Sequence, residues 1–155
     1  MKKIAFLTLL ALTMLAINAF AQNIALGERA PETKPAAWLA GQQPSAAELS
    51  YIEFFHASNK ASLTALEQLQ KLTHKLGTKL RVIIVTQEKE DKISPLLTPY
   101  LSSQISVALD GSGKIFTAFG VNYVPFGVLT DSRNRVLWMG NSLQLTEDVI
   151  HKNSR

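Results

Sequence analysis

The chain of 155 residues contains no cysteine. It therefore cannot form disulfides, attach a lipid through a thioether or supply the thiolate that redox exchange requires. Stability has to come from an apolar core, and 46% of the residues are hydrophobic. This length corresponds to one domain with a sizeable core, and it leaves no room for two.

The chain also has only a small excess of positive charge. The formal net charge is +4, and Lys2 and Lys3 account for two of the 16 basic residues, so the other 14 nearly balance the 12 acidic ones. The densest basic group has no aromatic residues interleaved with it: Lys71, Lys75, Lys79 and Arg81. This pattern indicates a solvated helix face and excludes a nucleic-acid partner, which would need a basic patch with stacking aromatics.

The first 21 residues, MKKIAFLTLLALTMLAINAFA, combine a basic start with an apolar run and small residues at Ala19 and Ala21. These are the three parts of a secretory signal peptide. A transmembrane anchor is disfavoured, because the run is short, contains polar residues and lacks a basic flank after it. We predict cleavage after Ala21, a periplasmic or secreted mature protein, and no stable membrane insertion after cleavage.

Residues 22–47 predict an extended lead-in, because three prolines prevent a long helix: Pro31, Pro35 and Pro44. We expect Trp38 and Leu39 to anchor this segment on the domain that follows. That domain is assigned to residues 48–155.

The first half of the domain predicts strand, helix, strand. YIEFF, residues 51–55, has the aromatic and β-branched content of a strand. Leucines at 63, 66, 69, 72 and 76 give a helix one apolar face until Gly77 ends it. The apolar run LRVIIVT, residues 80–86, is typical of a parallel strand buried on both faces.

The second half predicts a helix over residues 91–102, interrupted by two prolines, and then a short strand, ISVALD. A glycine-rich turn leads into one or two helical turns in GSGKIFTAFGV, and a β-hairpin turns at residues 131–134. A last helix over residues 146–152 has Thr146 as N-cap. The whole order predicts an α/β sandwich, a central mixed β-sheet flanked by helices.

These residues also resemble a known family, the TlpA-like thioredoxins. LGERAP before a Trp-Leu pair is similar to that family's Gly-x-x-Ala-Pro opening, and YIEFFHAS resembles its strand before the active site. VALDGSGKIFTAFGVNYVPFGVLTDSRNRVLWMGN resembles its second half throughout. The resemblance covers almost all of the mature chain, and it implies a thioredoxin-like fold and thiol-disulfide chemistry.

The turn that carries this chemistry departs from the family pattern of Trp-Cys-x-x-Cys. With Phe55 placed on the family tryptophan, His56 and Asn59 fall near the two cysteine positions. With the strand register kept, Asn59 falls on the first. Neither alignment supplies a sulfur atom, so the chain cannot form a mixed disulfide.

Other catalysts at this turn are also disfavoured. His56 and Ser58 are two residues apart, about 7 Å in an extended strand, and no carboxylate in the segment is placed to orient the imidazole. We expect Ser58 or Asn59 to cap the following helix instead. The three histidines, at 56, 74 and 151, are too dispersed for a metal site, and no cofactor is expected.

The family resemblance further implies a cis peptide bond at Val124-Pro125, beside the former active-site turn, where thioredoxin-like proteins bind extended peptides. The pair either retains this binding or only shapes the loop before the next strand. The predicted binding surface comprises Phe55, His56, Ser58, Asn59, Tyr123, Val124 and Pro125. Three aromatic residues would add apolar contacts there and are equally compatible with a place in the core: Tyr123, Phe126 and Phe55.

The sequence therefore predicts an exported thioredoxin-like protein without redox cysteines, acting as a non-catalytic binding or accessory module in the cell envelope. Its expected partner is an envelope protein or an extended peptide. The alternative is a TlpA-like thiol-disulfide oxidoreductase that acts with a cysteine-bearing partner. A carrier of a small ligand is a third interpretation, for which the sequence shows no clear anchoring charge.

Overall fold

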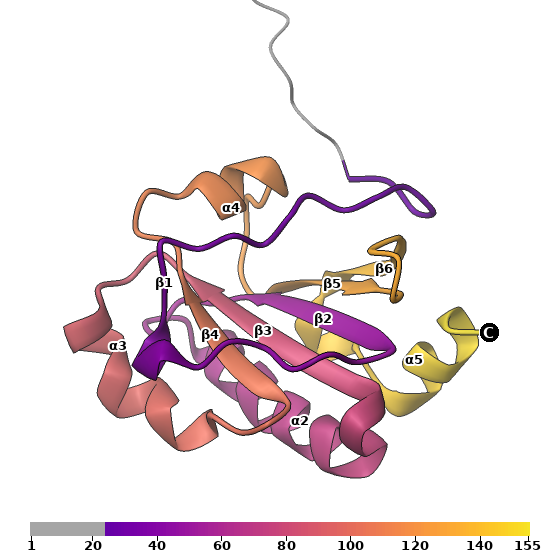
Figure 1. Cartoon of the computed structure of the whole chain (residues 1–155), viewed down its shortest axis with the longest axis horizontal. Helices are drawn as coiled ribbons and strands as arrows, with labels where there is room; N and C mark the ends of the chain where they lie inside the picture. Colours follow the sequence, from indigo (N-terminus) through magenta and orange to yellow (C-terminus); the bar gives the residue numbers. More distant parts are fainter. Residues whose placement is uncertain (1–23) are drawn as a thin grey trace, which may run out of the picture.

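A computed structural model describes residues 24–155 (Figure 1). The predicted signal peptide lies outside the described residues. The described chain forms, in order, β1(Ala37–Trp38), η2(Leu39–Gly41), β2(Leu49–Phe54), α2(Lys60–Leu76), η3(Gly77–Lys79), β3(Leu80–Thr86), α3(Glu90–Leu97), η4(Thr98–Tyr100), β4(Ile105–Leu109), α4(Lys114–Ala118), β5(Phe126–Thr130), β6(Val136–Asn141), η5(Ser142–Gln144) and α5(Glu147–Asn153).

The strands form one mixed sheet in the order β1-β4-β3-β2-β5-β6. The central strands β2, β3 and β4 are parallel, while β1, β5 and β6 pair antiparallel with their neighbours. Helices α2, α3 and α5 cover one face, and α4 and the lead-in cover the other (Figure 1). The predicted α/β sandwich with a central mixed sheet is confirmed.

Alternation along β2 and β3 divides the core between these two faces. Tyr51 and Ile84 point to the side of α2, whereas Ile52 and Ile83 point to the side of α4. Six of the seven residues of β3 are buried, as predicted for a strand covered on both sides. The exception is Arg81, which is half-buried.

The lead-in is more ordered than predicted. Ala37 and Trp38 pair with β4 and extend the sheet by an edge strand, and an isolated bridge joins Arg29 to Arg135. Leu39 is buried, so it is an anchor as predicted, while Trp38 is only partly buried. A two-residue strand gives no periodic signal in the sequence, because its pairing depends on a partner some seventy residues away.

The predicted helix over residues 91–102 is wrong at its C-terminal end. The α-helix ends at Leu97, and a 3-10 turn continues to Tyr100. Pro99 has no N–H to donate to the carbonyl of Pro95, and its ring crowds that carbonyl, so the α-helix cannot continue. The other predicted elements are present: α2 ends at Leu76 with Gly77 as its C-cap, the hairpin joins β5 to β6, and Thr146 caps α5 by accepting from the Val149 N–H.

Candidate functional site

The candidate site lies where the β2–α2 turn, residues 55–59, meets the Val124-Pro125 loop. Asn59 joins the two. Its Oδ1 accepts a hydrogen bond from the Ser62 N–H at 3.0 Å, and its Nδ2 donates to the Val124 carbonyl at 3.1 Å. Of the two predicted caps, Asn59 is therefore the one that caps α2, and the same side chain also binds the loop across the site.

We expect Asn59→Ala to destabilise the protein by about 2 kcal/mol, because it removes a helix cap and leaves the Val124 carbonyl without its partner. Ser58→Ala is the matched control. Ser58 is exposed, and its hydroxyl forms a local hydrogen bond with His56, so its loss is expected to change stability by about 0.5 kcal/mol or less. Urea denaturation of both variants measures the difference, and equal losses would contradict the assignment of the cap.

His56 and Ser58 are in contact, contrary to the expectation from the sequence. The Ser58 hydroxyl lies 2.8 Å from His56 Nδ1, and the Ser58 N–H donates to the same nitrogen at 3.2 Å. The expected separation of about 7 Å was wrong because it assumed an extended chain, whereas these residues already form a turn. As the acceptor of an N–H, Nδ1 carries no proton, which leaves the proton of the neutral ring on Nε2.

A carboxylate from another part of the chain also faces His56, whereas the expectation from the sequence concerned only carboxylates within the segment around the turn. Glu88 Oε1 lies 4.0 Å from His56 Nε2 and 2.9 Å from Lys92 Nζ, and Glu88 Oε2 accepts from the Ala57 N–H at 2.8 Å. Burial alone would raise the pKa of Glu88, but these donors and charges outweigh it and lower the pKa. Glu88 lies two residues after the end of β3. The sequence signal that was missed is that the parallel strands β2 and β3 end at the same edge of the sheet.

Ser58, His56 and Glu88 thus form a row that resembles a hydrolytic triad in composition only. The 4.0 Å between His56 Nε2 and Glu88 Oε1 is too long for a hydrogen bond, and Lys92 already compensates the carboxylate. The backbone N–H and the hydroxyl group of Ser58 both hydrogen-bond to His56 Nδ1, which is typical of a local turn stabilised by a side chain. The contacts fix the conformation of the β2–α2 turn.

The loop on the other side of the site contains the predicted cis peptide bond at Val124-Pro125, which is confirmed. Pro125 itself is buried, and Phe55 is fully buried in the core beneath α2. These two members of the predicted binding surface are therefore interior residues. Tyr123 is 49% exposed, and its ring packs edge-on against Phe126 with 5.3 Å between the ring centroids.

Beside Tyr123 the surface is hollowed by about 450 Å³. We call this feature the aromatic hollow; its lining residues are Ile24, Phe119, Gly120, Tyr123, Phe126, Met139 and Gly140. Among them, Tyr123 and Phe126 were predicted from the sequence to add apolar contacts beside the Val124-Pro125 loop. The others come from the lead-in, the segment after α4 and the second hairpin strand, so only the assembled sheet brings them together.

Beneath the site, Glu53 is buried in the middle of β2. The Tyr51 hydroxyl donates to Ser142 Oγ at 3.0 Å, and the Ser142 hydroxyl donates to Glu53 Oε2. The second oxygen, Oε1, has no hydrogen-bond partner among the described residues. Burial raises the pKa of Glu53 to about 8, against the opposing effect of its bonds with Ser142 and Tyr51, so the side chain is predominantly protonated at neutral pH.

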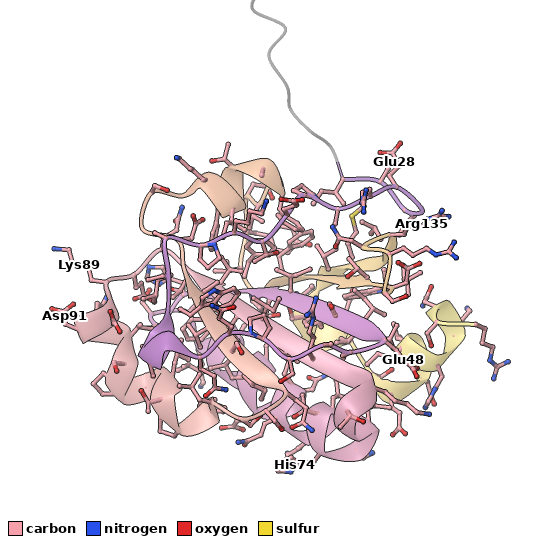
Figure 2. All side chains as sticks on the ribbon, in the orientation of Figure 1. Glu28, Glu48, His74, Lys89, Asp91 and Arg135 are labelled. Carbon is pink, nitrogen blue, oxygen red and sulfur yellow. The ribbon has the colours of Figure 1, made fainter. Side chains whose placement is uncertain are left out.

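Residues 24–155 contain no group of three or more histidine, aspartate or glutamate side chains positioned to hold a metal ion. His74 projects from the outer side of α2, away from the sheet (Figure 2). None of the helices in this part of the chain has the length and apolarity needed to cross a bilayer.

Comparison with solved structures identifies the fold. A putative thiol:disulfide interchange protein, DsbE, from Chlorobium tepidum superposes with a TM-score of 0.68 at 17% identity, over 86% of this chain and all of that one. A thioredoxin-like protein from Bacteroides caccae gives 0.67 at 17% identity, over 84% of this chain and 51% of that one. An exposed lipoprotein thioredoxin from Streptococcus pneumoniae gives 0.57 at 17% identity, over 70% and 84%.

No protein-family model and no curated protein sequence matches the chain. The fold and the geometry of the site nevertheless define the class: this is a protein of thioredoxin-like fold, with thiol-disulfide proteins among its structural neighbours. Within that class it is a cysteine-free protein in which Asn59 bridges the turn to the Val124-Pro125 loop. It cannot act as a thiol redox enzyme through its own side chains.

Proposed function

We propose that the protein is exported and acts in the cell envelope as a non-catalytic module that binds a partner protein through the aromatic hollow. The observation that carries the proposal is the half-exposed Tyr123 at a depression of about 450 Å³ whose lining side chains are aromatic and aliphatic. Tyrosine beside an apolar pocket is a common energetic centre of protein interfaces. The signal-peptide pattern of residues 1–21 supports export.

The hydrogen bond from Asn59 to the Val124 carbonyl favours one mode of binding over another. An extended peptide that paired with the backbone at Val124 would have to displace Asn59 from this carbonyl. An apolar side chain of a folded partner enters the aromatic hollow without breaking that bond. We therefore propose a folded envelope protein, rather than an extended peptide, as the partner.

A photo-crosslinking aromatic amino acid at position 123 tests the proposal in cells that express the full chain with its leader. The crosslinked protein is identified and purified, and its affinity is measured for the wild type and two variants. We expect Tyr123→Ala to weaken binding by about 30-fold, the effect of losing an interface hot spot. Leu26→Ala, an exposed apolar side chain that does not line the aromatic hollow, is expected to stay within about twofold.

Equal affinity of the wild type and a folded Tyr123→Ala variant would overturn the proposal. The alternative, an oxidoreductase completed by a partner, is separated by an assay of insulin-disulfide reduction. A binding module gives no activity above the reductant alone, either by itself or in the complex. If the complex is active and loses this activity when the partner's cysteine becomes serine, the alternative is correct.

A further inference from the structure

A second site lies near the start of β2 and β3, at the opposite end of these strands from the β2–α2 turn, around Arg81, which the sequence pattern assigned to a solvated helix face. Arg81 is the second residue of β3, and its guanidinium is held from two sides. Nε donates to Ser50 Oγ at 2.7 Å, and Nη1 donates to the Ser45 carbonyl at 2.9 Å. A guanidinium has five N–H donors, so three remain for another partner.

These donors border a cavity of about 280 Å³. Ile52 and Ile83 of the sheet line it, together with residues 32–34, Pro44 and Ala47 of the lead-in. Figure 1 shows the lead-in passing along the sheet once before β1 and again after η2, and residues from both passages line the cavity. The hairpin turn between β5 and β6 completes the lining.

The charges around the cavity leave Arg81 without a counter-ion. Two carboxylates line the cavity, but the Glu32 carboxylate pairs with Lys34, and Asp131 Oδ1 accepts from the N–H groups of Arg133 and Arg135 at 2.8 and 2.9 Å. Within residues 24–155, no carboxylate lies within 4.0 Å of the Arg81 guanidinium. Burial lowers the pKa of Arg81, because desolvation disfavours the charged form.

A guanidinium group that is partly desolvated, held in place and without a counter-ion provides a favourable binding site for an anion. We propose that the cavity binds a small ligand through a carboxylate or phosphate group on Arg81. The planar fork of the guanidinium matches either oxyanion in two parallel hydrogen bonds. The buried Ser50 hydroxyl fixes the fork, and Ile52 and Ile83 offer an apolar surface to the rest of the ligand.

This site differs from a second, more exposed group of arginines nearby. Arg29, Arg133 and Arg135 line a separate hollow of about 570 Å³, and the Arg135 side chain points outward into solvent (Figure 2). Exposed arginines of this kind attract anions weakly and in a salt-dependent manner. They supply the matched control, because Arg133→Gln removes the same charge without altering the Arg81 cavity.

The test is calorimetric titration of the purified mature protein with succinate and with inorganic phosphate, at ionic strength matched by sodium chloride. We expect saturable binding of at least one of them to the wild type. Arg81→Gln is expected to weaken it by about 10- to 100-fold, as for a lost charge-assisted hydrogen bond, while Arg133→Gln stays within about twofold. Whichever anion binds more tightly identifies the ligand group.

Arg81 also fastens the lead-in to β2, so Arg81→Gln is accompanied by a melting curve. If it does not fold, Arg81→Lys keeps the charge and loses the fork, and it is expected to weaken binding by about tenfold. The methyl NMR signals of Ile52 and Ile83 should shift during titration of the wild type. Absence of saturable binding, unchanged binding in a folded Arg81 variant, or shifts confined to the surroundings of Arg133 would overturn the proposal.

Discussion

Replacing Glu53 by glutamine is expected to remove a fall in stability that the wild type shows between pH 4.5 and about 8. The carboxyl group is fully buried on β2, and burial raises its pKa from an ordinary value of 4.5 to about 8. The folded protein therefore keeps this proton across a range in which the unfolded chain releases it. Stability falls as pH rises wherever the folded state binds more protons than the unfolded state.

The size and limits of the effect follow from the same shift. Below pH 4.5 both states are protonated and Glu53 causes no pH dependence, and above about pH 8 both are ionised and the loss is complete. The loss is on the order of 5 kcal/mol, since one pKa unit corresponds to about 1.4 kcal/mol. Glutamine resembles the protonated carboxyl group: it keeps an acceptor for Ser142 and places a neutral donor at the position of the unpartnered Oε1.

Urea denaturation of the wild type and Glu53→Gln, repeated from pH 4.5 to 8.5, measures the expected difference in slope. Near neutral pH and above, the variant is expected to be the more stable protein. Glu67→Gln, at an exposed position of α2, is the control and should retain the wild-type slope. Parallel profiles for the wild type and Glu53→Gln would show that Glu53 does not hold its proton in the folded state.

Gly127→Ala is expected to destabilise the protein by about 3 kcal/mol or to prevent folding. Gly127 lies opposite Glu53 in the β2–β5 pair, and the Tyr51 ring covers it. A Cβ at position 127 would lie 1.7 Å from the Tyr51 hydroxyl oxygen and 2.1 Å from Cζ. The ring is fully buried, so it has no free space into which to move.

Denaturation midpoints of Gly127→Ala and Gly111→Ala test this expectation. Gly111 is exposed, and no heavy atom lies within 4 Å of the position that a Cβ would occupy there, so alanine should change stability by about 0.5 kcal/mol or less. Adding Tyr51→Phe to Gly127→Ala should not restore stability, because Cζ remains too close. A Gly127→Ala variant as stable as Gly111→Ala would show that the Tyr51 ring does not occupy this position.

Glu53 and Gly127 belong to one assembly beneath the candidate site. Tyr51 and Glu53 lie on the same face of β2, Gly127 provides the space for the Tyr51 ring, and Ser142 connects both side chains from η5. This assembly supports the end of β2 from which the β2–α2 turn leaves. A substitution that disrupts this assembly is expected to shift the end of β2 and thereby the β2–α2 turn. Tyr123→Ala, in contrast, changes only the exposed surface.

Several features of the protein were determined by local sequence. The leucine spacing in α2, the apolar run of β3, the turn at residues 131–134 and the Thr146 cap each act over a few residues, and each is present. The family resemblance also gave the fold and the cis bond before Pro125 correctly. The absence of cysteine alone excludes thiol chemistry, since no folding can supply a missing atom.

Other features depend on tertiary structure, because their partners are distant in the chain. Three hydrogen bonds join residues far apart in the sequence. The partners are separated by 65 positions for Asn59 and Val124, by 91 for Tyr51 and Ser142, and by 31 for Ala57 and Glu88. Residue patterns report periodicity and caps, but they do not show which side chains the sheet brings into contact.

Burial likewise decided the roles of individual side chains. Phe55 fitted the core and the binding surface equally well by residue type, and only its position under α2 makes it a core residue. In the sequence, Glu53 is not distinguished from an ordinary strand residue. In the structure, the two neighbouring strands and η5 exclude its side chain from water. Local sequence therefore determined the class of fold and the absence of thiol chemistry, whereas the three-dimensional arrangement decided which polar groups are buried, because desolvation depends on all the surrounding chain.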